Sequence, residues 1–240
     1  SWYSSLAREV LKKMKVILTL NNETIKNLAN AGLTNAKICG DTRYDQVKTI
    51  QDFNLFKVSK PCVLLGSSWE EEEKMVSSIY KEFPHVQFII APHDISSHRI
   101  TYIQQLFNKE SALLSNGNLD DLPPVLIIDK IGILAELYSI SDIAIIGGGF
   151  KDKLHNIIEP AAKGNYILFG PKHSRYPEAS EMINANIADS FSNQTELKTK
   201  IITAIENSNV LDDFKQRSTN FSKEKKGATE LVYQEIKNYL

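Results

Sequence analysis

Three consecutive glycines at 147–149 follow a short apolar run at 143–146, and polar residues stand a few positions downstream. The apolar run is rich in β-branched residues, which is typical of a buried strand that ends in a tight loop. His155 and Asn156 then open a predicted helix. Backbone amides at a helix start carry partial positive charge, and glycines let another group approach the main chain closely. A strand, a glycine loop and a helix start in this order predict an anion site.

Two interpretations of Glu159 remain open. Asn156 is a good N-cap, and Glu159 stands three residues later, where it can reach back and complete a capping box. Pro160 is tolerated this close to a helix start, because the first-turn amides lack intrahelical partners. Alternatively, the Glu159 carboxylate receives both hydroxyls of a ribose, for which two acceptor oxygens are the natural partner.

A second predicted loop that could bind a ligand, Gly66-Ser67-Ser68, precedes a predicted helix. This helix begins with four glutamates at 70–73. In one interpretation a serine caps this helix and the acidic residues complement the helix dipole. In the other, the same hydroxyls and amides hold an anionic group of a ligand.

Two more loops carry polar residues, Pro92-His93-Asp94 and 129–132. His93 is a candidate hydrogen-bond donor to a phosphate or a sugar, against the common alternative of a structural histidine. His93, Asp94 and His98 stand close enough in sequence to suggest a metal site. The remaining histidines have no ligand-like spacing, so we expect neither a metal nor a cofactor.

Several nucleotide and hydrolase motifs are excluded. Gly147 and Gly149 match Gly-x-Gly, but position 152 is Asp, and the dinucleotide fingerprint belongs to the first strand of such a series rather than to the fourth. No Gly-Lys-Ser/Thr follows, so the loop is not a P-loop. Ser67 and Ser68 lack the nucleophile-elbow pattern, which makes a hydrolase a weak interpretation.

The elements that must position these loops alternate between strand and helix. This order predicts an α/β fold with a Rossmann-like parallel sheet, covered by helices on both faces. Ligands bind such sheets in the crevice at the carboxyl ends of the strands, where all four loops are expected. The predicted strands of the sheet are 62–65, 86–91, 125–128, 143–146 and 166–169.

The residues before this region form a separate, smaller pattern. A helix over 2–15, strands at 16–20 and 36–39, and a helix between them that Asn21 or Asn22 caps and Gly32 ends predict a β-α-β piece too small for its own core. A polar turn at 40–45 and a charged helical stretch to about Val58 follow. We therefore expect residues 1–45 and 46–240 to belong to different domains. The segment 108–124 is expected to be a loose connection, and amphipathic helices are expected after Gln194.

Composition sets wide bounds. The chain has 240 residues, a hydrophobic content of 42% and a formal net charge of -1, which gives no electrostatic reason to expect nucleic acid as a partner. Cys39 and Cys62 show no metal or redox spacing and suit reduced thiols. No apolar run is long enough to span a membrane and Ser1 opens no signal peptide, so the chain is expected to be soluble.

At these residues the chain resembles the 3-deoxy-D-manno-octulosonic acid (Kdo) transferases of lipopolysaccharide synthesis, which are inverting glycosyltransferases of the GT-B fold. The most specific match is the glycine loop followed by His-Asn-x-x-Glu-Pro. Together the matching segments cover most of the chain in the right order. They are Gly40-Asp41-Thr42-Arg43-Tyr44-Asp45, Gly66-Ser67-Ser68-Trp69-Glu70-Glu71-Glu72-Glu73, Ala91-Pro92-His93, Gly147-Gly148-Gly149-Phe150, His155-Asn156-Ile157-Ile158-Glu159-Pro160-Ala161-Ala162 and Leu168-Phe169-Gly170-Pro171.

The resemblance implies cytidine monophosphate (CMP)-activated Kdo as the donor and a lipid A precursor as the acceptor. It implies that the chain is the C-terminal, donor-binding half of a GT-B enzyme with the tail of the N-terminal domain. The family's general base, acceptor contacts and membrane contacts lie in the N-terminal domain, so we expect no catalytic residue in this chain and no transfer by it alone. The parent enzyme is expected at the cytoplasmic face of the bacterial inner membrane.

The resemblance also assigns roles by position. The serine loop would face the Kdo or the phosphate, the glycine loop with His155 and Asn156 would hold the phosphate, Glu159 would hold the ribose, and the backbone near 129–134 would read the cytosine. The substrate-binding residues expected in this way are Gly66, Ser67, Ser68, Pro92, His93, Lys130, Gly132, Ile133, Leu134, Gly147, Gly148, Gly149, His155, Asn156 and Glu159.

This chain departs from the family pattern in two places. Many members carry an arginine between the proline and the histidine of the second loop, which is absent between Pro92 and His93. Many members also have Gly-Glu-Leu where this chain has Gly132-Ile133-Leu134, which removes a polar contact. The cations that could replace the arginine at the phosphate are Arg99, Lys130, Lys151 and Lys172.

Two other functions remain open. Another GT-B enzyme that uses a uridine nucleotide sugar, such as an epimerase or a hexosaminyltransferase, would share the glycine loop and the ribose carboxylate. A non-catalytic nucleotide-binding module is the alternative from a different class.

Overall fold

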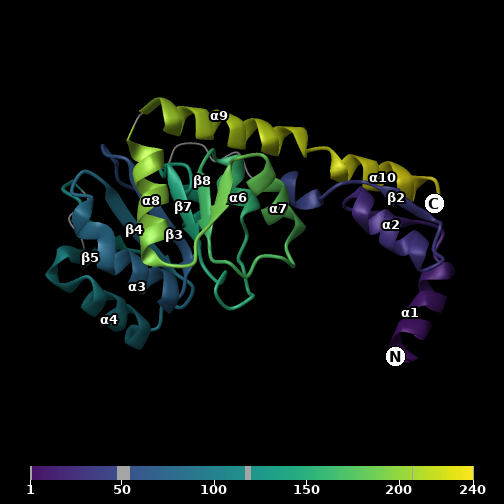
Figure 1. Ribbon diagram of the computed structural model, residues 1–240, viewed down its shortest axis with the longest axis horizontal. Coiled ribbons are helices and arrows are strands. Elements are labelled where there is room, and N and C mark those ends of the chain that lie inside the picture. Colours follow the sequence, from purple (N-terminus) through teal and green to yellow (C-terminus); the bar gives the residue numbers. More distant parts are fainter. Residues whose placement is uncertain (1, 48–54, 117–119, 207, 240) are drawn as a thin grey trace. The chain divides into compact units, whose positions relative to one another are not determined.

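The computed structural model describes residues 2–47, 55–116, 120–206 and 208–239 (Figure 1). Contacts between Cα atoms divide the chain into two compact units. The first comprises Ser1–Val47 together with Ser222–Leu240, and the second comprises Lys48–Phe221. The two ends of the chain therefore belong to the same unit, whereas the sequence places everything after residue 45 together.

The first unit contains the expected β-α-β piece. Strands β1 (Ile17–Thr19) and β2 (Ala36–Ile38) pair in parallel, and α2 (Asn22–Asn30) connects them. Asn21 caps α2, because its Oδ1 accepts a hydrogen bond of 2.9 Å from the Thr24 amide. Helix α1 (Trp2–Lys12) precedes this piece, and the 3-10 turn η1 (Thr42–Tyr44) follows it.

The last helix, α10 (Ala228–Lys237), is tied to the early part of the chain. The Asp45 carboxylate accepts hydrogen bonds from the amides of Gly227 and Thr229, at 2.6 and 2.7 Å. A carboxylate at a helix start satisfies amides that have no intrahelical partner. Lys37 forms an ion pair with Glu235 further along the helix, at 2.7 Å. These contacts explain why residues 222–240 cluster with residues 1–47.

The second unit contains a seven-stranded sheet in which every strand pair is parallel. The strand order is β5-β6-β4-β3-β7-β8-β9. The strands are β3 (Cys62–Ser68), β4 (Gln87–Pro92), β5 (Ser111–Leu113), β6 (Val125–Ile127), β7 (Ile143–Ile146), β8 (Tyr166–Phe169) and β9 (Ala188–Ser190). The predicted α/β fold with a parallel sheet is confirmed.

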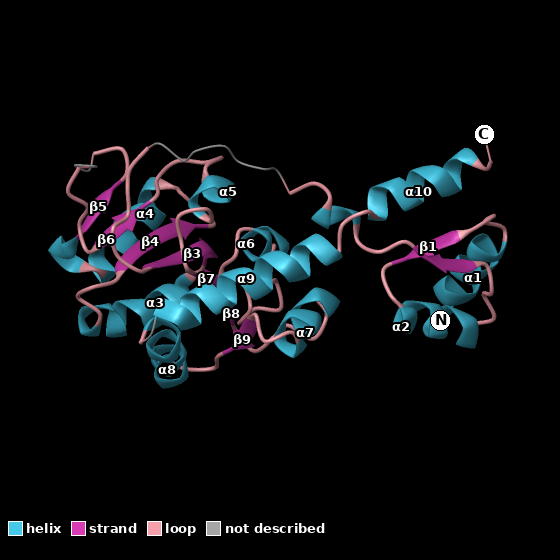
Figure 2. Cartoon of the chain, turned by 90° about the horizontal axis from the view of Figure 1, so that it is seen from above, coloured by secondary structure: helices cyan, strands magenta, loops and turns pink. Residues whose placement is uncertain are grey.

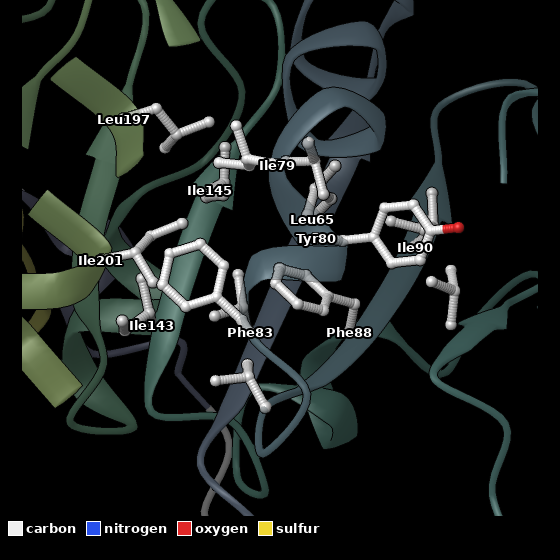
Figure 3. Close-up of a cluster of buried hydrophobic side chains, with 14 of the residues drawn as sticks. Leu65, Ile79, Tyr80, Phe83, Phe88, Ile90, Ile143, Ile145, Leu197 and Ile201 are labelled. Carbon is white, nitrogen blue, oxygen red and sulfur yellow. The ribbon is translucent and has the colours of Figure 1, made fainter. Parts of the chain in front are cut away.

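Helices cover both faces of this sheet (Figure 2). Leu65 of β3 belongs to a buried cluster with Val76 of α3, Ile103 of α4 and Ile201 of α8. Figure 3 shows Leu65 and Ile201 among the side chains of this cluster. Gly66, the next residue of β3, faces the other side, where an added Cβ would lie 2.3 Å from the Tyr138 hydroxyl just after α5. The helices of the unit are α3 (Glu70–Ile79), α4 (Ser97–Leu106), α5 (Leu134–Leu137), α6 (Ile158–Ala162), α7 (Pro177–Asn184), α8 (Gln194–Ile205) and α9 (Ser208–Glu224), with 3-10 turns η2 (Tyr80–Glu82) and η3 (Asn108–Glu110).

Three parts of the chain differ from the sequence prediction. The segment 108–124, expected to be a loose connection, contains η3 and the edge strand β5. The strand β9 at the opposite edge is not among the predicted strands. A helical stretch was expected up to about Val58. Residues 45–47 and 55–58 are turn and loop instead, and residues 48–54 lie outside the described residues.

The strand order reverses between β3 and β7. From β3 the chain proceeds to β4 on one side, and β7 pairs with β3 on the other side before the chain continues to β8. In open parallel sheets this reversal opens a crevice at the carboxyl ends of the two central strands, where ligands bind. Gly66-Ser67-Ser68, which the sequence predicts as a loop, forms the last three residues of β3. This serine segment and the glycine loop after β7 therefore lie at the expected binding position.

Candidate functional site

The start of helix α3 is held by a glutamate rather than by a serine. Trp69 is the N-cap residue, and Glu72 accepts a hydrogen bond of 3.1 Å from the Trp69 amide. Ser68 is buried and donates its hydroxyl proton to Glu73 at 2.8 Å. Of the two interpretations, the serine cap is not formed, because the Ser68 hydroxyl turns toward a buried carboxylate of the same helix.

Glu72 also links the serine loop to the glycine loop. Its second carboxylate oxygen accepts a hydrogen bond of 3.0 Å from the amide of Gly148. The side chain is fully buried, and this burial raises the pKa of Glu72 to about 7 although both amides favour the charged form. One carboxylate thus fixes the two loops that flank the crevice.

The glycines of the loop are required by close packing of the main chain. A Cβ on Gly147 would lie 2.0 Å from the Ser67 carbonyl oxygen, and one on Gly149 would lie 2.5 Å from the Gly170 nitrogen. Gly148 has φ +88°, a conformation that side chains other than glycine rarely adopt. The loop therefore packs between the ends of β3 and β8, and Gly170, which follows β8, is part of the same contact.

Helix α6 starts later than the sequence predicts. It covers Ile158–Ala162, with Ile157 in the N-cap position, so the capping box expected between Asn156 and Glu159 is not formed. Asn156 instead accepts a hydrogen bond of 2.9 Å from the Ile158 amide, two residues on. Asn156 is exposed and Glu159 is half-buried at the start of this single turn. The carboxylate of Glu159 is thus left free of the capping role.

Three aromatic side chains from separate loops form a cluster at the crevice. The ring of Trp69, after β3, stacks on that of His93, after β4, with 5.3 Å between centroids and 14° between planes. His93 lies 4.7 Å from His155, which follows the glycine loop. The indole Nε1 of Trp69 donates a hydrogen bond of 3.0 Å to Nε2 of His155. The tertiary fold therefore brings together the two histidines that the sequence singles out.

Positive charge surrounds this cluster. The ammonium groups of Lys151 and Lys153 lie 4.9 and 5.9 Å from the centre of the Trp69 ring. Lys151 also pairs with Glu71 at 3.3 Å. Burial lowers the pKa of His155, and the neighbouring His93 lowers it further. The site therefore offers cations together with a histidine that favours its neutral form.

A pocket of about 500 Å³ adjoins the ring cluster, between the starts of α3 and α4. Arg99 on its wall pairs with Glu73, whose side chain is completely buried. Glu70 and Tyr102 were not among the candidate residues, although Tyr102 stands three residues after Arg99 and hence on the same helix face. The pocket is lined by Ser68, Trp69, Glu70, His93, Asp94, His98, Arg99, Tyr102 and Lys151.

The other predicted residues lie outside this lining. Lys130 and Gly132 are exposed in the loop after β6, and Leu134 begins α5. Pro92 is buried at the end of β4. The predicted residues that do not line the pocket are Gly66, Ser67, Pro92, Lys130, Gly132, Ile133, Leu134, Gly147, Gly148, Gly149, His155, Asn156 and Glu159.

His93, Asp94 and His98 line the pocket without forming a metal centre. Within residues 2–47, 55–116, 120–206 and 208–239, no group of three or more histidine, cysteine, aspartate or glutamate side chains has a metal-binding arrangement. Cys39 and Cys62 are both buried and free.

Comparison with curated proteins gives consistent matches. The chain is 26% identical to a 3-deoxy-D-manno-octulosonic acid transferase of Aquifex aeolicus over 205 residues, which cover 82% of this chain and 56% of that protein. It is 25% identical to the enzyme of the same name from Rickettsia conorii over 232 residues, 90% of this chain and 50% of that protein. The resemblance to the Kdo transferases is confirmed. The chain spans about half the length of these relatives. No family model matches the chain.

Solved structures confirm the fold class. The C-terminal CMP-Kdo binding domain of WaaA from Acinetobacter baumannii superposes with a TM-score of 0.59 at 17% identity, over 67% of this chain and 88% of that domain. A UDP-GlcNAc 2-epimerase from Neisseria meningitidis gives a TM-score of 0.61 at 15% identity, over 93% of this chain and 61% of that one. At these identities the similarity shows the shared GT-B type of fold. In the part of the chain that the structure describes, no helix is both long and apolar enough to cross a membrane.

Proposed function

We propose that this chain supplies the donor-binding half of an enzyme that transfers Kdo from CMP-Kdo to a lipid A precursor in lipopolysaccharide synthesis. The carrying observation is that four segments shared with the Kdo transferases, 66–73, 91–93, 147–150 and 155–162, contact one another at the point where the strand order reverses. The curated relatives are named 3-deoxy-D-manno-octulosonic acid transferases. A structural neighbour is a CMP-Kdo binding domain.

The chemistry of the crevice suits departure of a nucleotide. Transfer of the sugar leaves CMP with a negatively charged phosphate, which must be stabilised as the bond to the sugar breaks. His93, His155 and Lys151 are the groups that would meet this phosphate. The free carboxylate of Glu159 would accept the ribose hydroxyls, and the main chain of the loop after β6 would contact the cytosine. These roles follow the positions that the Kdo transferase motifs occupy in this chain.

Transfer with inversion also needs a base that removes the proton of the acceptor hydroxyl. We assign this base, the acceptor contacts and the membrane contact to the N-terminal half of the parent protein. That half corresponds to the part of the relatives that this chain does not cover. The parent would act at the cytoplasmic face of the bacterial inner membrane. This chain by itself would bind donor and CMP without transferring the sugar.

The test is isothermal titration of the chain with CMP and, in parallel, with uridine monophosphate. We expect CMP to bind and uridine monophosphate to bind at least about tenfold more weakly, as one or two base-specific hydrogen bonds provide. His155→Ala should weaken CMP binding. His85→Ala is the matched control, because His85 is exposed at the amino end of the sheet, far along the strand from the crevice. Equal binding of both nucleotides would favour a uridine nucleotide-sugar enzyme, and no binding at millimolar CMP would exclude the proposal.

A second experiment tests the division of labour. The purified chain is incubated with CMP-Kdo and a lipid A precursor, and the product is analysed by mass spectrometry. We expect no transferred sugar from this chain and transfer from the full-length parent. Turnover by the chain alone would show that the base lies within these residues. A parent that binds CMP-Kdo without turnover would support a non-catalytic module.

A further inference from the structure

The hydrogen bond between Trp69 and His155 has only one possible direction. An indole ring carries a single N–H, which can donate and never accept. Its distance of 3.0 Å from the histidine Nε2 is that of an ordinary hydrogen bond. Nε2 of His155 must therefore accept, which requires that it carry no proton.

The direction of this bond determines the state of the whole imidazole ring. A neutral imidazole has one proton, so with Nε2 bare the proton stands on Nδ1. A charged imidazolium would bring a second N–H against the indole N–H and would lose the bond. The bond therefore favours the neutral ring, in the same direction as burial, which lowers the pKa of His155.

Both partners are held by their own main chains. The Trp69 amide donates to Glu72 at 3.1 Å, at the start of α3. The His155 amide donates to the Gly147 carbonyl at 3.2 Å, which closes the glycine loop. The rings of Trp69 and His155 lie 6.2 Å apart at 36°. The main chain is thus held by a hydrogen bond at each of the two residues that carry the rings.

The charged and titratable groups around the pair come from three elements. His93, from the loop after β4, lies 4.7 Å from the His155 ring. Lys151 and Lys153 of the glycine loop approach the Trp69 ring. Glu71 and Glu72 of α3 are engaged with Lys151 and with the two amides, respectively. Of these groups it is His93 that, together with burial, lowers the pKa of His155.

We propose that Trp69 is a positioning residue that holds His155 neutral, with its proton on Nδ1, so that Nδ1–H is the donor offered to the phosphate of the bound nucleotide. The role of the phosphate rests on the proposed function, whereas the state of the ring is a property of the free protein. A neutral donor binds phosphate without the pH dependence of an imidazolium. The lysines then supply the positive charge.

The first test is a long-range ¹H–¹⁵N correlation spectrum of the free protein, in which each histidine reports its own tautomer. For His155 we expect a protonated Nδ1 and an unprotonated Nε2 at neutral pH. Trp69→Phe keeps a stacking ring and removes the donor, so the tautomer preference should be lost and the titration of His155 should move to higher pH. A His155 that is charged at neutral pH, or protonated on Nε2, in the wild-type protein would overturn the proposal.

The matched control is Tyr102→Phe. This substitution also removes one ring hydrogen bond beside the same helix, the 3.1 Å bond from Tyr102 to Glu70, without touching His155. It should leave the His155 spectrum unchanged. A change equal to that of Trp69→Phe would mean that the spectrum reports general disturbance of the pocket, and the proposal would fail.

The second test is CMP affinity as a function of pH. Trp69→Phe should weaken binding about five- to tenfold at pH 8, the effect of one misplaced hydrogen bond, and less at pH 6, where the released ring becomes charged. The ratio of affinities at pH 6 and pH 8 should therefore be larger in the variant than in the wild type. Equal ratios would overturn the proposal. If the wild type does not bind CMP, the proposed function is rejected. The spectrum of the free protein then still tests the protonation state of His155.

A further pair of variants needs no change at Trp69. The amide of asparagine reaches about as far as Nδ1 of histidine, and that of glutamine about as far as Nε2. His155→Asn should therefore retain more CMP affinity than His155→Gln. The opposite order would contradict the assignment of Nδ1 as the donor.

Discussion

At the scale of single residues, Gly147 of the glycine loop and Gly132 of the loop after β6 show two different reasons for glycine. Gly147 stands where a Cβ would lie 2.0 Å from the carbonyl oxygen of Ser67. Gly132 has φ +92° with nothing within 4 Å of an added Cβ. The first position excludes side chains by contact with a neighbouring strand end, and the second by backbone conformation alone.

Substitution should separate these two reasons. At Gly132, alanine should cost about 1–2 kcal/mol of unfolding free energy, and asparagine much less because it tolerates the left-handed conformation. At Gly147, alanine and asparagine should both cost about 1–3 kcal/mol or more, since either brings a Cβ into the Ser67 carbonyl. Urea unfolding of the four variants measures the costs. A Gly147→Ala variant as stable as the wild type would show that the loop can move away from β3.

Glu73 makes stability depend on pH. Its side chain is completely buried, and burial raises its pKa from 4.5 to about 7, although Ser68 and Arg99 both favour the charged form. Because the folded carboxyl keeps its proton to higher pH than the unfolded one, the folded state binds more protons between these two values. The free energy of unfolding should therefore fall as the pH rises from about 4.5 to about 7, by up to about 1.4 kcal/mol per pH unit for one such group.

The prediction is tested by urea unfolding at several pH values. Glu73→Gln should reduce the slope in this window, and part of the slope should remain because burial also raises the pKa of Glu72. Glu82→Gln, at an exposed carboxylate, is the control and should keep the wild-type slope. A stability that rises with pH across this window would contradict the burial argument.

At the scale of elements, Asn165 joins three parts of the second unit just before β8. The side chain is fully buried. Its Nδ2 donates to the carbonyl oxygens of Tyr138 and Pro160, at 2.8 and 3.1 Å, and its Oδ1 accepts from Ser141 at 2.6 Å. One amide thus connects α6, which carries Glu159, with the end of α5 and the loop before β7.

Asn165→Ala should cost about 3 kcal/mol of unfolding free energy, because three hydrogen bonds are lost and buried partners are left without water. Ser141→Ala removes one of these bonds and should cost about 1 kcal/mol. Denaturant unfolding measures both. Equal costs would mean that the link between Asn165 and α6 contributes nothing.

The prediction of secondary structure from the sequence fails at the shortest strands. The edge strands β5 and β9 have three residues each, and β9 reads Ala-Asp-Ser. Periodicity cannot be detected over three residues, and polar residues are tolerated at an edge strand because one side lacks a partner. These strands are formed by pairing with β6 and β8. Their existence is therefore a consequence of the sheet and not of local sequence.

At the scale of the whole molecule, the loops of the candidate site belong to one unit. The residues from Gly66 to Glu159 lie within Lys48–Phe221. The first unit contributes none of them. Nucleotide binding is therefore predicted to be a property of the second unit.

A chain of residues 48–226, which keeps α9 whole, should fold and bind CMP as tightly as the complete chain. Thermal unfolding followed by circular dichroism and titration with CMP measure the two properties. Loss of CMP binding in a folded fragment would show that the first unit contributes to the nucleotide site. The reverse fragment cannot serve as a control, because the first unit is formed by both ends of the chain.

The sequence by itself determined the class of fold and the central strands. Strands β7 and β8 begin and end where the pattern predicts, because buried parallel strands are continuous apolar runs that end at glycines and polar residues. The family resemblance also followed from the order of the motifs. All of these features are local in the chain.

Only the tertiary structure decided which side chains meet. Trp69 and His155 are 86 positions apart and share a hydrogen bond, and Glu72 reaches 76 positions to the Gly148 amide. Neither the serine cap nor the Asn156 capping box forms: the Ser68 hydroxyl donates to Glu73, and α6 begins at Ile158, whose amide donates to Asn156. Hydrogen bonds in the interior are chosen by the geometry of neighbouring strands, and sequence spacing carries no information about that geometry.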